Sequence, residues 1–245
     1  MTLPSPVLES AKLLVARRLG LEFPARRAAD LERALTAVEP GREAALVAAL
    51  HDDHAPEWRP LIHALTVRES YFFRDTAPLE RALAELVARR GTEGELRLWS
   101  AGCAAGEEPY TLAMLLEQML GDLAGRRLTI LATDVDAPSL DAAARGRYGE
   151  WALRTTPAWA RARYFDERFE LSRQIRELVT FVPLNLVTDP YPGGFDLIVC
   201  RNVLMYFTEP ARRAAVERLE AAVAPDGRLV LSPLDAPVGP GELVA

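Results

Sequence analysis

The stretch WSAGCAAGEEPY (residues 99–110) combines small residues with two consecutive carboxylates, Glu107 and Glu108. The glycines at 102 and 106 would allow a ligand to approach the backbone closely. A turn that binds phosphate relies on backbone N–H groups and a lysine, and it avoids carboxylates. We therefore expect a ligand here that carries positive charge or hydrogen-bond donors of its own, and not a simple phosphate.

Short apolar runs alternate with helical patterns on both sides of this stretch. The alternation is typical of a parallel sheet with helices on both faces, so it predicts an α/β fold. The expected strands are 96–101, 128–134, 179–184, 195–200 and 228–233, and the helices between them are 109–120, 138–145 and 209–223.

The residues that follow these strands are candidates for ligand binding, because ligands of open parallel sheets bind at the carboxyl ends of the strands. An acid after the second strand commonly accepts hydrogen bonds from ribose hydroxyl groups, which makes Asp134 a candidate for that role. In chain order, the residues at the four strand ends are Ala101 and Gly102, then Asp134, then Asn185 and Leu186, then Asn202 and Val203.

Together, these strand ends predict a nucleoside-binding α/β domain. The sequence has no phosphate-loop lysine, which argues against ATP, and the two glutamates argue against a pyrophosphate. S-adenosyl-L-methionine fits better, because it carries adenosine, a sulfonium and an ammonium but no phosphate. We therefore expect this cofactor, with S-adenosyl-L-homocysteine as product. We expect no metal site, since the HDDH run at 51–54 is better explained as a solvated turn.

The N-terminal part of the chain has helical spacing and no strand-like alternation. Helices are expected from Ser5 to Gly20 and over 25–38, 43–50 and 57–65, and a fifth from Thr76 to Gly91 leads to the first strand. We therefore divide the chain into a helical domain, residues 1–75, and a cofactor-binding domain, residues 76–245. The weakly patterned stretch around 148–177 is interpreted as an insertion between the second and third strands.

Five segments of the sequence carry a family resemblance. ESYFFRD, LWSAGCAAGEEPYTLAMLL, LATDVD, LNL and FDLIVCRNVLMYF occur in this order and closely resemble the CheR family, the chemotaxis receptor methyltransferases. The resemblance implies a Rossmann-like methyltransferase domain. It also implies methyl transfer from S-adenosylmethionine to glutamate side chains on the cytoplasmic helices of methyl-accepting chemotaxis receptors. The product would be a glutamyl methyl ester that serves chemotactic adaptation.

The resemblance also implies the site residues. Arg74 would hold the substrate carboxylate, because a guanidinium pairs with it in a planar fork. Tyr206 would either donate a hydrogen bond or shape the pocket by packing. Glu108 is interpreted as the start of a helix, where the helix dipole favours a carboxylate, and Arg68 stands where family members often have asparagine. The implied cofactor-binding residues are Ser70, Arg74, Ala101, Gly102, Glu107, Asp134, Asn185, Leu186, Asn202 and Val203.

The insertion departs from part of the family. Members that tether to a receptor's C-terminal pentapeptide have a three-stranded β-subdomain with a glycine-containing loop in this place. The segment YFDERFELSRQI (164–175) has no glycine and little room for one. The resemblance therefore points to a short β insertion and to a member without a pentapeptide tether.

Charge and hydropathy limit the other partners. The net charge of −6 gives no general affinity for nucleic acid. No apolar run approaches the roughly 18 residues of a membrane span, so we expect no membrane insertion and a cytoplasmic location. Two alternatives stay open: a cofactor-binding regulatory module without turnover, and a methyltransferase that acts on another protein or on a small molecule.

Overall fold

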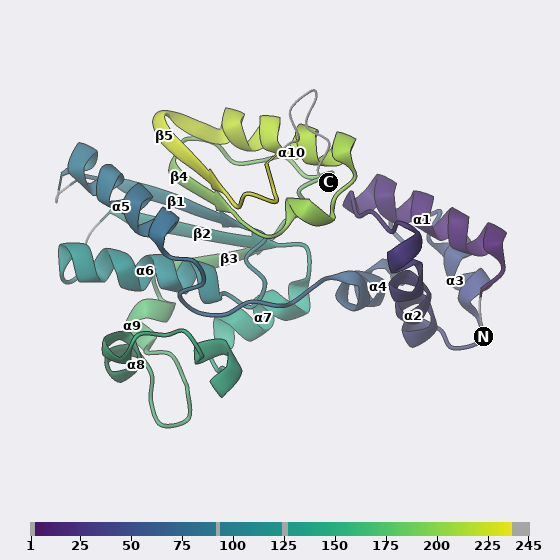
Figure 1. The fold of residues 1–245 in the computed structure, drawn as a ribbon, viewed down its shortest axis with the longest axis horizontal. Helices are drawn as coiled ribbons and strands as arrows, with labels where there is room; N and C mark the ends of the chain where they lie inside the picture. Colours follow the sequence, from purple (N-terminus) through teal and green to yellow (C-terminus); the bar gives the residue numbers. More distant parts are fainter. Residues whose placement is uncertain (1–2, 92–93, 124–126, 237–245) are drawn as a thin grey trace.

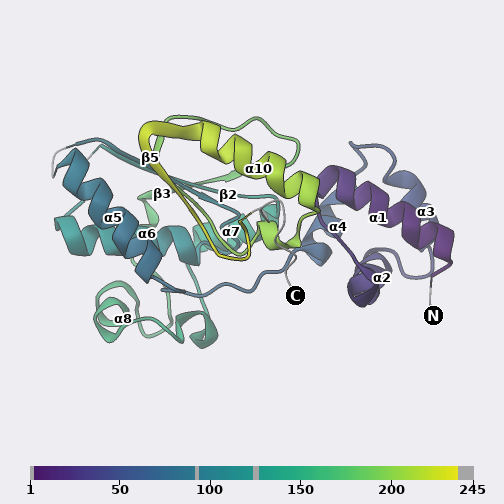
Figure 2. The same cartoon turned by 45° about the horizontal axis from the view of Figure 1, so that its top comes forward.

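A computed structural model describes residues 3–91, 94–123 and 127–236 of the chain. It confirms the expected α/β fold: a helical bundle lies beside a layered α/β unit (Figure 1). A second view shows the same arrangement, with the N-terminus in the bundle, away from the sheet (Figure 2). Residues 237–245 of the second expected domain lie outside the described residues. None of the described helices is long and apolar enough to cross a bilayer.

The bundle contains the expected N-terminal helices with small shifts in their bounds. Its helices pack around one core of leucine, valine, alanine, phenylalanine and tryptophan side chains drawn from residues 11 to 65. Gly20 ends the first helix in the left-handed conformation (φ 71°) that glycine adopts without strain. The four helices are α1 (Ser5–Leu19), α2 (Ala28–Val38), α3 (Glu43–Ala49) and α4 (Trp58–Leu65), with a 3₁₀ turn over Ala25–Arg27 before α2.

The sheet has five parallel strands in the order β3-β2-β1-β4-β5. The order reverses direction between β1 and β4, which is the point where ligands bind in open α/β sheets. The first four strands match expectation closely, and the fifth begins five residues before its expected start. The strands are β1 (Leu96–Ala101), β2 (Leu128–Asp134), β3 (Val179–Pro183), β4 (Phe195–Cys200) and β5 (Val223–Leu231).

Helices cover both faces of the sheet. Alternate strand residues point to opposite sides, so each face has its own apolar side chains for the helices to bury. Leu98 and Leu197 belong to a core shared with α5 (Ala77–Arg90), α6 (Glu107–Leu120) and α7 (Ala137–Arg145). Trp99 and Ile198, one position further, belong to a second core shared with α10 (Glu209–Ala222). Helix α6 begins two residues before its expected start, which places both glutamates of the opening motif in its first turn.

The insertion after α7 is mostly helical. It contains a 3₁₀ turn over Glu150–Leu153, α8 (Ala158–Tyr164) and the short α9 (Arg173–Arg176). Within the described ranges its β structure consists of two antiparallel bridges, Arg147 to Glu170 and Phe165 to Leu171. The expected β insertion is therefore reduced to isolated bridges between loops.

Backbone hydrogen bonds join the bundle to the sheet domain. The N–H of Glu22 donates to the carbonyl of Tyr206 (2.8 Å), and the N–H of Thr208 donates to the carbonyl of Gly20 (2.7 Å). A Cβ at Gly20 would lie 2.9 Å from the Val187 side chain, so glycine also allows this close approach. The end of α1 is therefore fixed to the loop that follows β4.

One buried carboxylate organises that loop. Asp235, which follows β5 and has no exposed surface, accepts the backbone N–H groups of Asn202, Val203 (3.0 Å) and Met205 (2.9 Å). It also accepts the hydroxyl of Ser232. The carboxylate thereby satisfies three partly buried backbone donors that no strand or helix serves.

Replacing Asp235 by alanine should destabilise the protein strongly. Each donor left unsatisfied costs about 1–3 kcal/mol, so we expect the free energy of unfolding to fall by about 3 kcal/mol or more. Urea unfolding followed by circular dichroism measures this change. Asp226→Ala is the matched control, because Asp226 is an exposed residue of β5. Equal stability of the two variants would contradict the role of Asp235.

Candidate active site

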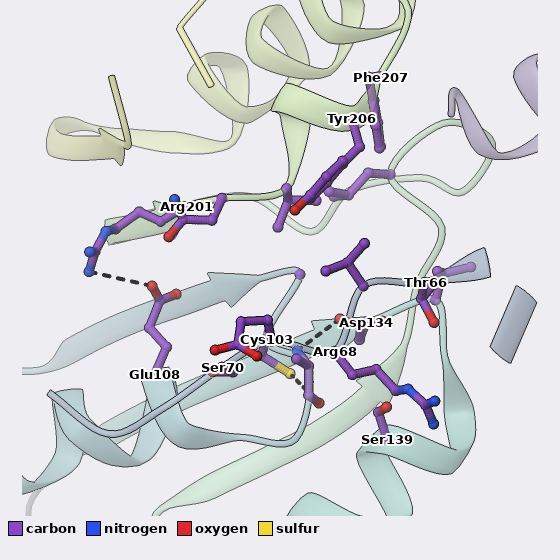
Figure 3. A pocket seen from close by; sticks show the side chains of 18 of the residues that line it. Thr66, Arg68, Ser70, Cys103, Glu108, Asp134, Ser139, Arg201, Tyr206 and Phe207 are labelled. Atoms are coloured by element: carbon purple, nitrogen blue, oxygen red, sulfur yellow. Dashed lines mark hydrogen bonds and ion pairs between the residues drawn. The ribbon is translucent and has the colours of Figure 1, made fainter. Parts of the chain in front are cut away.

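A cavity lies at the carboxyl ends of the strands, between the sheet and the bundle. It measures about 1200 Å³ when its opening to solvent is counted. Its walls come from the end of α1, the segment 65–74, the turns after β1 and β2, and the loops after β3 and β4. Figure 3 shows the side chains of these segments facing one common space.

Most of the residues proposed from the sequence meet in this cavity. Ala101 and Glu107 are the exceptions, because both are buried outside its lining. The proposed residues that line it are Ser70, Arg74, Gly102, Asp134, Asn185, Leu186, Asn202, Val203 and Tyr206.

Asp134 ends β2 and faces the cavity (Figure 3). One carboxylate oxygen accepts the N–H of Ala104 (2.8 Å) and the other accepts the N–H of Asp136 (2.9 Å). Each oxygen keeps a lone pair for a ligand hydroxyl, since a carboxylate oxygen has two. Burial raises the pKa of this carboxyl above its ordinary value.

Glu107 lies beneath the cavity in the first turn of α6, with 4% of its surface exposed. The nearby Ser70, which does line the cavity, acts to lower the pKa of Glu107. Its Oε2 atom is buried without a hydrogen-bond partner among the described residues. Burial is the main cause that raises the pKa of Glu107. An orphaned acceptor of this kind fits a ligand that brings donors or positive charge.

Glu108 lies in the first turn of α6, one residue after the helix begins and close to the expected start, but it also lines the cavity, which was not predicted from the sequence. The hydroxyl of Ser100 donates to it (2.8 Å), and Nη1 of Arg201 lies 3.7 Å from its Oε2. Burial raises the pKa of Glu108, while Arg201 acts in the opposite direction. Arg201 directly follows the expected strand 195–200 and so belongs to the strand ends expected to meet, but no role was predicted for it.

The charged groups occupy two ends of the cavity. Figure 3 shows Arg201 and Glu108 facing each other at one end, and Asp134, Arg68 and Ser139 at the other. A ligand that spans the cavity would therefore contact the Arg201–Glu108 ion pair at one end and Asp134, the predicted ribose-binding residue, at the other.

Arg74 lines the cavity with few contacts of its own. Its Nη1 donates to the carbonyl of Glu69 (3.2 Å), and its guanidinium lies 5.3 Å from the ring centre of Tyr71. Its Nε is buried without a partner among the described residues. The guanidinium therefore keeps donors for a ligand, as the sequence analysis requires of a carboxylate-binding residue.

Asn185 lines the cavity, but its polar atoms serve the fold. Its Nδ2 donates to the carbonyl of Arg18 at the end of α1 (2.8 Å), and its Oδ1 accepts the N–H of Val187 (2.9 Å). Its backbone N–H and carbonyl are both bonded to Asp189. Asn185 is thus a joint between bundle and sheet, while its neighbour Leu186 adds apolar surface to the cavity.

The turns after β1 and β4 fit closely against each other. Gly102 has φ +78°, and a Cβ there would come within 2.4 Å of the Val203 side chain. Asn202 also adopts a left-handed conformation, with φ 61°. The ring of Tyr206 lines the cavity on one side and receives the guanidinium of Arg27 at 5.3 Å from its centre.

Arg68 is held by a chain of hydrogen bonds. Its Nη1 lies 2.7 Å from Nε2 of His63, whose Nδ1 lies 3.0 Å from the buried carboxylate of Asp136. Ser139 donates to the same carboxylate (2.5 Å). Because arginine only donates, His63 accepts at Nε2 and donates from Nδ1. Arg68 is therefore tied through α4 to the start of α7.

This set of residues fits S-adenosylmethionine. Apolar side chains such as Val135 and Leu186 lie beside Asp134, which suits an adenosine with its ribose hydroxyl groups. The buried Glu107 and the cavity-lining Glu108 suit the positive charges of the rest of the molecule. No lysine lines the cavity, consistent with a ligand that has no phosphate.

Comparison with known proteins agrees with this geometry. The sequence model described as "CheR methyltransferase, SAM binding domain" matches residues 68–235. The chain belongs to the CheR methyltransferase family. The matched region is the S-adenosylmethionine-binding domain of that family, and it contains every site residue proposed above.

Named relatives of the CheR family are similar over much of the chain. The chain is 35% identical to the chemotaxis protein methyltransferase of Escherichia coli over 189 residues. This alignment covers 73% of this chain and 64% of the relative. The identity is 37% with chemotaxis protein methyltransferase 1 of Pseudomonas aeruginosa (72% and 69% covered) and 34% with a probable one of Rhizobium etli (69% and 67%). The matched region thus spans about two thirds of the length of these relatives.

Replacing Asp134 by asparagine should weaken cofactor binding without unfolding the chain. The change removes charge-assisted hydrogen bonds worth about 1.5–3 kcal/mol, so affinity for S-adenosylhomocysteine should fall about tenfold or more. Asparagine is preferred to alanine because its one carbonyl oxygen can still accept one of the two backbone N–H groups that Asp134 binds, whereas alanine would lose both. Titration calorimetry measures the affinity, with the exposed Asp141→Asn as control. Unchanged affinity would refute the assignment.

The raised pKa of Glu107 predicts a pH-dependent stability. A carboxyl whose folded-state pKa is raised stabilises the fold when protonated, below about pH 4.5, and loses that contribution as pH rises through its folded value. As the pH rises from 4.5 to neutrality, the melting temperature of the cofactor-free wild type should therefore decrease relative to that of Glu107→Gln. Glu167→Gln, at an exposed position, is the control. Parallel curves for wild type and Glu107→Gln would show that the buried carboxyl carries no such penalty.

Proposed function

We propose that this protein transfers a methyl group from S-adenosylmethionine to glutamate side chains on the cytoplasmic helices of chemotaxis receptors, forming glutamyl methyl esters in the cytoplasm. The observation that carries the proposal is the position of Arg74. It lies within the family's cofactor-binding domain and lines the cavity, and among the described residues its guanidinium makes one hydrogen bond, to the carbonyl of Glu69. The names of the relatives, chemotaxis protein methyltransferases, support the substrate class.

The chemistry needs orientation more than acid–base help. A glutamate carboxylate is already ionised near neutral pH, so no general base has to remove a proton. The bound cofactor supplies the methyl group on its sulfonium. The chain has to hold the accepting oxygen in line with that group, and a planar guanidinium can fix both oxygens of the carboxylate. Arg74 is the residue proposed for this task.

Tyr206 is the second residue proposed at the reacting end. It lines the same cavity, and its backbone carbonyl accepts the N–H of Glu22 from the bundle. Its hydroxyl has no hydrogen-bond partner within the described parts of the chain, which leaves it free to donate to a substrate oxygen. We propose this role for the hydroxyl, while the ring of Tyr206 packs against the guanidinium of Arg27.

The insertion supports action without a pentapeptide tether. Its described residues form two short helices and isolated bridges, and no strand of three or more residues is assigned there. A peptide that adds to a sheet needs an exposed strand edge. We therefore propose that the receptor is recognised at its methylated helices alone.

The direct test incubates the protein with methyl-labelled cofactor and a receptor cytoplasmic fragment, with and without its last five residues. Both fragments should take up label at the same rate, and mild base should release it as methanol, as expected of a carboxyl methyl ester. Base-stable label would assign the enzyme to another acceptor group. Cofactor binding without any transfer would favour a regulatory module, and faster labelling of the longer fragment would refute the tether-independent reading.

Replacing Arg74 by lysine should separate orientation from cofactor binding. Lysine keeps the charge but loses the planar fork, and misplacement by about 1 Å can cost on the order of a hundredfold in rate. Affinity for S-adenosylhomocysteine should change much less, because Asp134 lies at another part of the cavity. Rate, affinity and melting temperature are measured on one preparation, with the exposed Arg81→Lys as control. A parallel fall of all three would mean that Arg74 braces the fold.

A further inference from the structure

The backbone on either side of Arg74 adopts unfavourable conformations. Phe73 has φ 57° and Asp75 has φ 44°, and both are non-glycine residues in the left-handed region. Such conformations persist only where the surroundings fix them, and they are found most often at functional sites. The segment that carries Arg74 therefore depends on contacts from other elements.

On its N-terminal side, this segment is held by backbone and hydroxyl groups. The N–H of Phe72 donates to the carbonyl of Ala152 (2.9 Å), and the hydroxyl of Thr155 donates to the carbonyl of Phe72 (2.6 Å). The N–H of Phe73 donates to the hydroxyl of Thr111 on α6 (3.1 Å). These bonds fix the chain as far as Phe73 and leave Arg74 and Asp75 to other partners.

Arg201 supplies the contacts on the C-terminal side. It follows β4 directly, and only 5% of its side chain is exposed. Its Nη2 donates to the carbonyl of Arg74 (3.0 Å) and lies 3.8 Å from the carboxylate of Asp75. Its Nη1 lies 3.7 Å from Glu108, which the hydroxyl of Ser100 holds in turn. One rigid guanidinium thus connects β4 and α6 to the backbone of Arg74.

The side chain of Arg74 makes few contacts that would fix its direction. Among the described residues it makes one hydrogen bond to a neighbouring carbonyl, a loose contact with the ring of Tyr71 and an electrostatic interaction with Glu108. Where its guanidinium can reach therefore depends on where the backbone places its Cα. The geometry points to Arg201 as a positioning residue, which fixes the carbonyl of Arg74 so that the Arg74 guanidinium reaches the substrate carboxylate. This inference rests on the proposed function.

The test compares Arg201→Lys with Arg90→Lys. Lysine keeps the charge beside Glu108 but, as a single ammonium group, cannot reproduce the fork that joins three partners. Arg90 is the matched control, because it pairs with the buried Asp196 near the amino end of β4 and does not touch the Arg74 segment. Arg201→Lys should lower kcat about ten- to hundredfold, with affinity for S-adenosylhomocysteine and melting temperature close to those of Arg90→Lys.

A double-mutant cycle separates positioning from a general structural role. If Arg201 acts through Arg74, its replacement should cost little once Arg74 is already lysine, because the two effects are then not additive. An equal loss in both backgrounds would overturn the inference. So would a fall in kcat that Arg90→Lys reproduces, or wild-type kcat in Arg201→Lys.

Hydrogen exchange gives a readout that does not need turnover. The amides of residues 74–76 should exchange faster in Arg201→Lys than in the wild type, while Arg90→Lys leaves them unchanged. Unchanged exchange in Arg201→Lys would overturn the inference even if receptor methylation were never observed. Failure of receptor methylation together with faster exchange would instead overturn the proposed function and leave the positioning role standing.

Discussion

The backbone N–H groups of Asn202, Val203 and Met205 converge on one buried carboxylate, that of Asp235. The loop they belong to supplies three proposed site residues and also carries the hydrogen bonds that join the bundle to the sheet. Without Asp235 these N–H groups would lack an acceptor, and each such group would destabilise the folded position of the loop. The cavity is therefore fixed from a residue that follows β5 and does not line it.

Burial also determines which charges the cavity favours in a ligand. The carboxyl groups of Glu107, Glu108 and Asp134 all have pKa values raised by burial, so their surroundings disfavour the ionised forms. A ligand with positive charge or donors would stabilise the ionised forms, whereas a phosphate would disfavour them further. Burial thus explains the two glutamates behind a glycine-rich turn. Glu108 pairs with Arg201, and Glu107 keeps one oxygen without a partner among the residues that the structure describes.

The sequence predicted the elements well, because strong periodicity and glycine or proline boundaries decide local structure. It also predicted which strand ends meet, since parallel strands bring their carboxyl ends to one edge. It could not predict contacts made across the chain. Asn185 was proposed for the cofactor, yet its amide holds the end of α1, 167 residues away. Glu108 and Arg201 lie 93 positions apart by number, and nothing local in either segment shows that they face each other.

The bundle that precedes residue 75 takes part in the cavity. Leu19, Leu21 and Arg27 line it from the bundle side, and His63 of α4 holds Arg68 at its edge. The bundle therefore does more than pack beside the sheet, because its side chains form part of the cavity wall. Because the bundle closes one side of the cavity and binds its loops through backbone hydrogen bonds, its removal would expose apolar surface and leave those bonds unmade. The bundle and the sheet domain therefore form the site together.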